Sequence, residues 1–97
     1  MTGKYDAIIA GSGPNGLAAA IYLQSKGLCT LILEQSETAG GAVQTRELTL
    51  PGFRHDIGSS IHPLAYDSPF FSSLPLETHG LNWVHPESAY AHPYEDG

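Results

Sequence analysis

Apolar and polar blocks alternate along the first third of the chain. Residues 5–10, after Asp6, are apolar on both faces, and residues 29–33 are also apolar, which predicts two strands of a parallel sheet covered by helices. Between them, the apolar and alanine-rich residues 15–26 predict a helix that is buried over much of its surface. Gly27 then marks the end of this helix. The pattern predicts a β–α–β unit with a right-handed crossover.

The chain becomes polar and rich in glycine and proline after residue 34. Residues 45–50 alternate weakly and predict an edge strand, and Pro51-Gly52 is a turn signal. The remaining predicted elements are a short helix at 68–74 and short strands at 81–84 and 89–94. The Asp96-Gly97 pair is a hairpin signal without its second strand, and a stable sheet needs at least three strands. We therefore interpret residues 1–97 as the truncated N-terminal portion of a single larger domain, cut inside a hairpin.

A glycine-rich loop joins the first predicted strand to the predicted helix. It reads Gly11-Ser12-Gly13-Pro14-Asn15-Gly16, a G-x-G-x-x-G pattern in the strand-to-helix position that a dinucleotide-binding unit requires. Gly11 allows the tight turn, Gly13 lets a pyrophosphate approach the backbone, and Gly16 lets the helix pack closely on the strands. Pro14 suits the first helical position, where the free N–H groups and the helix dipole attract a diphosphate. Asn15 has two open interpretations, donation to a phosphate or tolerance of an unusual backbone angle.

An acid and a second glycine pair follow the second predicted strand. Glu34 lies 18 residues after Gly16 and can accept two hydrogen bonds from adenosine ribose hydroxyls. A carboxylate there also repels a 2′-phosphate, which argues against NADP. Gly40-Gly41 lies six residues beyond Glu34 and would let the loop backbone pass close to the pyrophosphate of a larger cofactor. The alternatives are a solvated glutamate and an ordinary surface turn.

Composition excludes several functions. The chain has 97 residues, of which 41% are hydrophobic, and a formal net charge of −6 from 4 basic and 10 acidic side chains. It offers no basic patch, so nucleic-acid binding is not expected. Cys29 is the only cysteine, which excludes an internal disulfide, and we interpret it as a buried apolar filler. The longest apolar run, residues 17–23, is far shorter than the roughly 20 residues of a membrane span. No leader pattern precedes the first strand, so the cytoplasm is the expected location.

Residues 7–45 resemble the extended FAD-binding motif of glutathione-reductase-type flavoproteins, and within that group the phytoene-desaturase-like and amine-oxidase-like oxidoreductases. Residues 50–86 are similar to the bacterial phytoene-desaturase-like branch. The resemblance implies a partial Rossmann-type α/β FAD/NAD(P)-binding domain with additional short β segments, and FAD as the cofactor. It implies an FAD-dependent oxidoreductase that oxidises or desaturates a small organic substrate, apolar or an amine, by hydride transfer to the flavin.

This chain alone is expected to bind FAD weakly, to be inactive, and to self-associate through open sheet edges. Two alternatives stay open, a segment of an NAD-dependent dehydrogenase and a non-catalytic dinucleotide-binding module.

The resemblance also implies the site residues. The expected cofactor-binding residues are Gly11, Ser12, Gly13, Pro14, Asn15, Gly16, Glu34, Gly40, Gly41 and Ser59. Ser59 belongs to residues 56–60, which in relatives run beside the flavin ring. Relatives often carry arginines around the double glycine, where this chain has Thr38 and Ala42, and Arg46 is the candidate substitute. No residue is identified as a catalytic acid, base or nucleophile.

Histidines and aromatic residues have more than one interpretation. The five histidines lack the helical spacing of a metal site, so no metal is expected. His55 and His62 flank residues 56–60 and are interpreted as hydrogen-bonded loop histidines, with a flavin contact as the alternative. The aromatic residues Trp83, Phe53, Phe70 and Phe71 are interpreted as core, with a lipophilic substrate channel as the alternative.

Overall fold

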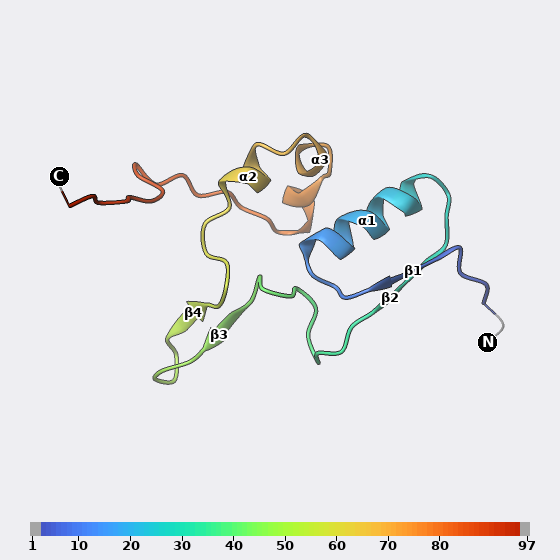
Figure 1. Ribbon diagram of the computed structural model, residues 1–97, viewed down its shortest axis with the longest axis horizontal. Coiled ribbons are helices and arrows are strands. Elements are labelled where there is room, and N and C mark those ends of the chain that lie inside the picture. Colours follow the sequence, from blue (N-terminus) through green and yellow to red (C-terminus); the bar gives the residue numbers. More distant parts are fainter. Residues whose placement is uncertain (1–2, 96–97) are drawn as a thin grey trace. The chain divides into compact units, whose positions relative to one another are not determined.

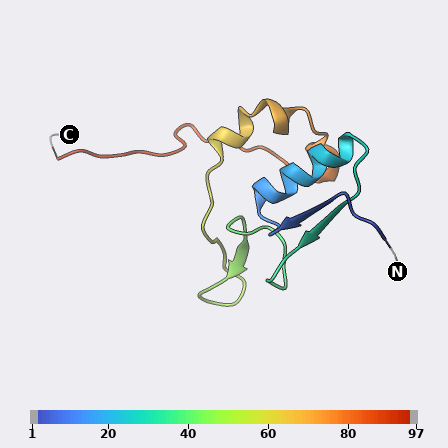
Figure 2. The ribbon, with the colours of Figure 1, turned by 45° about the vertical axis from the view of Figure 1, so that its right-hand side comes forward.

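A computed structural model describes residues 3–95, and the chain divides into two compact units, Met1–Ser60 and Ile61–Gly97. The first unit contains a β–α–β arrangement followed by a hairpin, and the second contains short helices (Figures 1 and 2). All the expected cofactor-binding residues lie in the first unit. None of the helices described between residues 3 and 95 has the length and apolar character needed to cross a membrane.

The first unit begins with two parallel strands joined by a helix. β1 (Ala7–Ala10) pairs with β2 (Thr30–Leu33) in parallel, with Ala7 opposite Thr30 and Ala10 opposite Leu33. The connecting helix α1 (Pro14–Ser25) packs against both strands (Figure 1). The predicted order of elements and the parallel pairing are therefore confirmed, with element ends within about two residues of the predicted ones.

Local stereochemistry sets both ends of α1. Gly13 is the N-cap residue with an extended backbone, and Pro14 is the first helical residue, where a missing N–H costs nothing. At the other end, the N–H of Lys26 donates to the carbonyl of Leu23, and Gly27 takes a φ of +82°. This left-handed glycine ends the helix as the sequence predicts.

Burial in the first unit is slight, because one helix packs against only two strands. Ala20 of α1 is buried at 4% exposure, but Ile8 of β1 and Leu33 of β2 are 63% and 55% exposed. The sequence predicted that both faces of the strands and most of α1 are buried, and for the described residues this prediction is wrong. An apolar run on both faces predicts a covered strand, but the covering layers are not built by these residues.

Cys29 is also exposed, which makes its interpretation as a buried filler wrong. It precedes β2, where its N–H donates to Oδ2 of Asp6 at 2.8 Å. The chain enters the sheet at this point, and no described residue of the first unit covers the Cys29 side chain.

A two-stranded hairpin follows the glycine-rich loops. β3 (Thr45–Glu47) pairs antiparallel with β4 (Arg54–Asp56), so that Thr45 lies opposite Asp56 and Arg46 opposite His55. The turn contains Gly52, as predicted, and the N–H of Phe53 donates to the carbonyl of Leu50. The predicted edge strand is confirmed in a shorter form. Its partner β4 was not predicted, because its three exposed polar residues carry no apolar alternation.

Three short helical turns lie in the part of the second unit that the structure describes, residues 61–95. They are α2 (Pro63–Tyr66), α3 (Pro69–Ser72) and the 3-10 helix η1 (Leu76–His79). The predicted helix at 68–74 is confirmed by α3, which Ser68 caps by accepting a hydrogen bond from the N–H of Phe71. The strands predicted at 81–84 and 89–94 are wrong, because these segments meet no partner strand in the described part of the chain. The Asp96-Gly97 hairpin signal lies outside the described residues.

Candidate functional site

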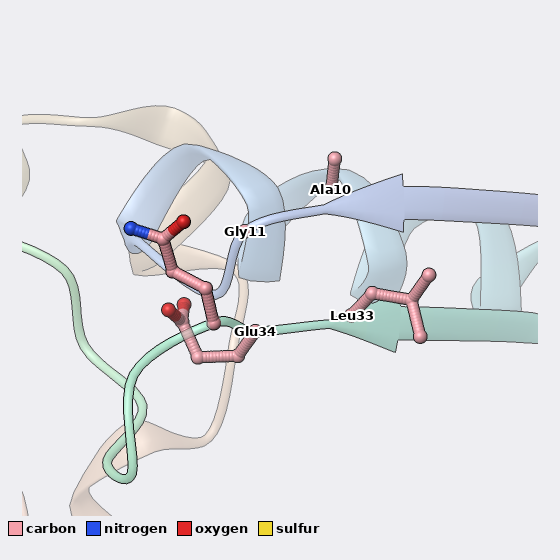
Figure 3. Close-up of a pocket in the computed structure, with 5 residues that line it drawn as sticks. Ala10, Gly11, Leu33 and Glu34 are labelled. Carbon is pink, nitrogen blue, oxygen red and sulfur yellow. The ribbon is translucent and has the colours of Figure 1, made fainter.

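The two strands of the first unit end side by side, and the candidate site lies at these ends. Gly11 follows β1 and donates its N–H to the carbonyl of Leu33 at 2.7 Å, while Glu34 follows β2. Figure 3 shows the Glu34 carboxylate turned toward the loop that begins at Gly11. A pocket of about 550 Å³ opens here, lined by Ala10, Gly11, Leu33, Glu34 and Gln35. Ligands of open parallel α/β sheets bind at this carboxyl end of the strands.

The carboxylate of Glu34 accepts hydrogen bonds from two segments. Its Oε2 accepts from the N–H of Ser12 at 2.8 Å and from the hydroxyl of Ser12 at 2.6 Å. Its Oε1 accepts from the N–H of Ser36 at 2.9 Å. The acid is therefore fixed against the glycine-rich loop, and the interpretation of Glu34 as a solvated side chain without a partner is wrong.

These hydrogen bonds lower the pKa of Glu34 from its ordinary 4.5 to about 2. The Ser12 hydroxyl contributes most, followed by the N–H groups of Ser36 and Ser12 and, least, by the Ser36 hydroxyl, while partial desolvation opposes them. Glu34 is therefore ionised at neutral pH. In that state it accepts hydrogen bonds from sugar hydroxyls and repels an additional phosphate.

The start of α1 presents free backbone donors beside this acid. The N–H groups of Gly13, Asn15 and Gly16 have no hydrogen-bond partner within residues 3–95. Asn15 lies inside α1, and no described residue other than glycine has a positive φ, so its interpretation as an unusual backbone position is wrong. Free N–H groups at the positive end of a helix dipole favour an anion.

Two of the loop glycines are required by their surroundings. Gly11 takes a φ of +93°, which residues with a Cβ rarely adopt. A Cβ on Gly16 would overlap the carbonyl oxygen of Gly11 and would lie 3.4 Å from Cγ2 of Ile9. Gly11 therefore makes the turn and Gly16 lets α1 pack on the loop, as the sequence predicts.

The double glycine lies against the first glycine loop. The N–H of Gly40 donates to the carbonyl of Ser12 at 3.0 Å, and a Cβ on Gly41 would lie only 2.9 Å from Cα of Gly13. Gly41 also has a positive φ of +59°. The two loops therefore touch through bare backbone, and the interpretation of Gly40-Gly41 as an ordinary surface turn is wrong.

The segment that contains Ser59 adjoins the double-glycine loop at its other side. The N–H of Ile57 donates to the carbonyl of Gln44, and a Cβ on Gly58 would lie 2.9 Å from the carbonyl oxygen of Ala42. Ser59 follows directly and is half-buried. The fold thus brings together all the expected cofactor-binding residues except Ser59, which is linked to the others through this segment. Arg46, the candidate substitute for missing arginines, is exposed on β3.

Two neighbours of Glu34 were not predicted from the sequence, namely Gln35, which lines the pocket, and Ser36, which donates a hydrogen bond to Glu34. No sequence pattern identifies Ser36, because its donor is a backbone N–H, which every residue except proline carries.

The histidines and aromatic residues do not line the pocket beside Glu34. Nε2 of His55 lies 3.0 Å from Oγ1 of Thr49, so His55 is a hydrogen-bonded histidine, although on β4 rather than in a loop. Among residues 3–95, no cluster of three metal-ligating side chains is present. In the second unit the ring of Trp83 packs edge-on against Tyr66, with centroids 5.4 Å apart. Phe53 is 60% exposed, so its interpretation as a core residue is wrong.

The parallel strands, the glycine loop at the helix start and the ionised acid define a dinucleotide-binding protein of the Rossmann type. The comparison with protein families agrees. The chain belongs to the NAD(P)-binding Rossmann-like domain family, whose model matches residues 9–74.

Several curated proteins are similar to this chain over most of its length. A rat protein named pyridine nucleotide-disulfide oxidoreductase domain-containing protein 2 is 38% identical over 91% of this chain and 15% of its own length. The 1-hydroxycarotenoid 3,4-desaturase of a Flavobacterium species is 36% identical over 94% of this chain and 18% of its own length. A limonene dehydrogenase polypeptide of Castellaniella defragrans is 30% identical over 95% of this chain and 16% of its own length.

The chain thus spans less than a fifth of the length of these relatives, which are named as an oxidoreductase-domain protein, a desaturase and a dehydrogenase subunit. Its own homology is to an oxidoreductase family. No solved structure matches it significantly.

Proposed function

We propose that this site binds the adenosine diphosphate half of FAD. The observation that carries the proposal is the pair of hydrogen bonds from Ser12 to Glu34, since they hold an ionised acid beside the free N–H groups of the α1 start. In this arrangement the diphosphate lies on backbone and the ribose on the acid.

Each expected residue has a role in the proposal. Gly11, Ser12, Gly13, Pro14, Asn15 and Gly16 form the diphosphate loop, Glu34 accepts from the ribose, Gly40 and Gly41 lie along the diphosphate, and Ser59 lies on the flavin side. The contact between Gly13 and Gly41 supports a close approach of the diphosphate, because no side chain stands between the two loops. The N–H groups of Gly13, Asn15 and Gly16, which lack partners in the described residues, supply donors for its oxygens.

We further propose that residues 1–97 are the N-terminal portion of one FAD-binding domain in a larger FAD-dependent oxidoreductase of the phytoene-desaturase-like kind. In such a protein the bound flavin would supply a two-electron acceptor for the oxidation or desaturation of a small organic substrate. The flavin, when bound, supplies this electron-accepting chemistry, and the protein supplies binding and orientation. The relatives named as a desaturase, a dehydrogenase and an oxidoreductase support the class. We also propose that the protein is located in the cytoplasm and that this chain self-associates.

A second candidate is a segment of an NAD-dependent dehydrogenase. The description of the matching family names NAD(P), and the contact of Glu34 with the loop suits NAD as well as FAD. The double glycine favours FAD, since an NAD site has no particular need for a second backbone loop against the diphosphate.

Calorimetric titration of the 97-residue chain with FAD, NAD and NADP tests the proposal. We expect weak binding of FAD, weaker binding of NAD, and no measurable binding of NADP. Glu34→Gln should raise the dissociation constant for FAD about three- to tenfold, because it removes a charge-assisted acceptor. Glu37→Gln, at an exposed neighbouring acid, is the matched control and should leave FAD binding unchanged.

The outcomes separate the candidates. Tighter binding of NAD than of FAD would favour the dehydrogenase. Equal binding of NADP, or no effect of Glu34→Gln, would contradict the proposed role of the acid. Tight, stoichiometric FAD with turnover would contradict the expectation that this chain alone is inactive.

A further inference from the structure

The acceptor positions of Glu34 are mostly taken before any ligand binds. An ionised carboxylate offers about four lone-pair sites, two on each oxygen. Oε2 already accepts two hydrogen bonds, both from Ser12, and Oε1 accepts one from the N–H of Ser36. By these three hydrogen bonds a single acceptor position, on Oε1, is left for a ligand, and the Ser36 hydroxyl beside it also lowers the pKa of Glu34.

Ser12 is held in place by a second segment. It is 4% exposed, and its carbonyl accepts from the N–H of Gly40 at 3.0 Å. Turning its backbone away from Glu34 would break this link between the two glycine loops. Turning its hydroxyl away would leave a buried donor without a partner, whereas every buried side-chain donor and acceptor described between residues 3 and 95 now has one.

We propose that Ser12 is a positioning residue that makes Glu34 bind one ribose hydroxyl and not two. The inference rests on the proposed function, because it concerns how the same site holds the adenosine ribose. The fingerprint by itself predicts that both hydroxyls donate to the acid. Here the Ser12 hydroxyl occupies the place of the second one, so the ligand class is an adenine nucleotide of which one ribose hydroxyl is recognised and the other is dispensable.

Deoxy analogues of ADP test this directly. The 97-residue chain is titrated calorimetrically with ADP, 2′-deoxy-ADP and 3′-deoxy-ADP, at equal salt and pH. We expect one analogue to bind about fivefold more weakly than ADP, as the loss of a charge-assisted hydrogen bond at a half-exposed site implies, and the other to bind within about twofold of ADP.

A substitution at Ser12 should change this pattern. Ser12→Ala frees a second acceptor position on Oε2, so both analogues should now bind more weakly than ADP. Ser25→Ala is the matched control, because the Ser25 hydroxyl donates only to the carbonyl of Tyr22 at the far end of α1. It should keep the wild-type pattern.

The outcomes are distinguishable. If both analogues bind more weakly than ADP in the wild type, or if Ser12→Ala keeps the wild-type ratio, the single-hydroxyl inference is overturned while ADP binding leaves the proposed function intact. If ADP binds neither the wild type nor any variant, the proposed function fails and this inference fails with it. If the Ser12→Ala chain does not fold, the comparison of the three nucleotides on the wild-type chain still decides the inference.

Discussion

Gly41 and Gly13 touch through bare backbone, although 28 residues separate them in the sequence. A Cβ on Gly41 would lie 2.9 Å from Cα of Gly13, a distance that real Cβ atoms essentially never show. Both neighbours at this contact are backbone, so no flexible side chain can yield. The double-glycine loop and the diphosphate loop therefore keep their approach only while Gly41 carries no side chain, whereas a Cβ on Gly13 would lie at an ordinary 3.9 Å from Cα of Gly41.

Gly41→Ala should weaken cofactor binding by pushing these loops apart. We expect the dissociation constant for FAD to rise about tenfold, which corresponds to roughly 1.4 kcal/mol of binding free energy. Calorimetric titration of both chains measures the change.

Gly52→Ala is the matched control for Gly41→Ala. Gly52 also has a positive φ, of +89°, but a Cβ there meets nothing within 4 Å, so the variant carries the backbone strain without the clash. It should lower stability by about 1–2 kcal/mol and leave FAD binding unchanged. Equal loss of FAD binding in both variants would show that strain, and not the approach of the loops, is responsible.

The low pKa of Glu34 predicts a pH dependence of stability. The folded-state pKa of about 2 lies below the ordinary 4.5, so the stabilising contribution of Glu34 is fully present above pH 4.5 and is lost as the pH falls through about 2. Urea unfolding at pH 7, 6 and 3 should therefore show a difference between the wild type and Glu34→Gln that is constant at the upper two values and smaller at pH 3. Glu37→Gln gives the same change of net charge as a control. A difference that stays constant down to pH 3 would contradict the pKa shift.

Gly16→Ala should destabilise the first unit, although alanine is ordinarily the better helix residue by about 1 kcal/mol. The added methyl would overlap the carbonyl oxygen of Gly11 and press on Ile9, and overpacking of this kind costs about 1–3 kcal/mol. The midpoint of urea unfolding measures the net loss.

The exposed helix position Ala19 provides the comparison. Ala19→Gly should lose only about 1 kcal/mol, through helix propensity, and should leave FAD binding unchanged. A Gly16→Ala chain more stable than the wild type would mean that α1 is not packed on the loop as described.

The sequence predicted the helices and strands that are set by the preferences of neighbouring residues. Pro14 and Gly27 set the ends of α1 through their own backbone preferences, and apolar segments on either side predicted the two strands. Strands at 81–84 and 89–94 were predicted from composition alone and do not form. A strand needs a partner, and local composition does not say whether one is present.

Within the site, the sequence identified the residues but not their contacts. Spacing placed Glu34 and the two glycine loops at one end of the sheet, because parallel strands end at the same edge. Spacing did not reveal that Ser12 occupies an oxygen of Glu34, nor that Ser36 donates to the other. These hydrogen bonds depend on side-chain directions that become fixed only when the loops pack together.

The sequence by itself determined a β–α–β unit with a glycine turn, a helix start and an acid at the end of the second strand, because periodicity and backbone preference act over a few residues. Only the tertiary structure decided that Gly41 lies against Gly13, that Cys29 is exposed, and that Glu34 is held by Ser12. Such contacts join residues far apart in the chain, or depend on which layers cover a strand. They arise from packing of the whole unit, which no local pattern specifies.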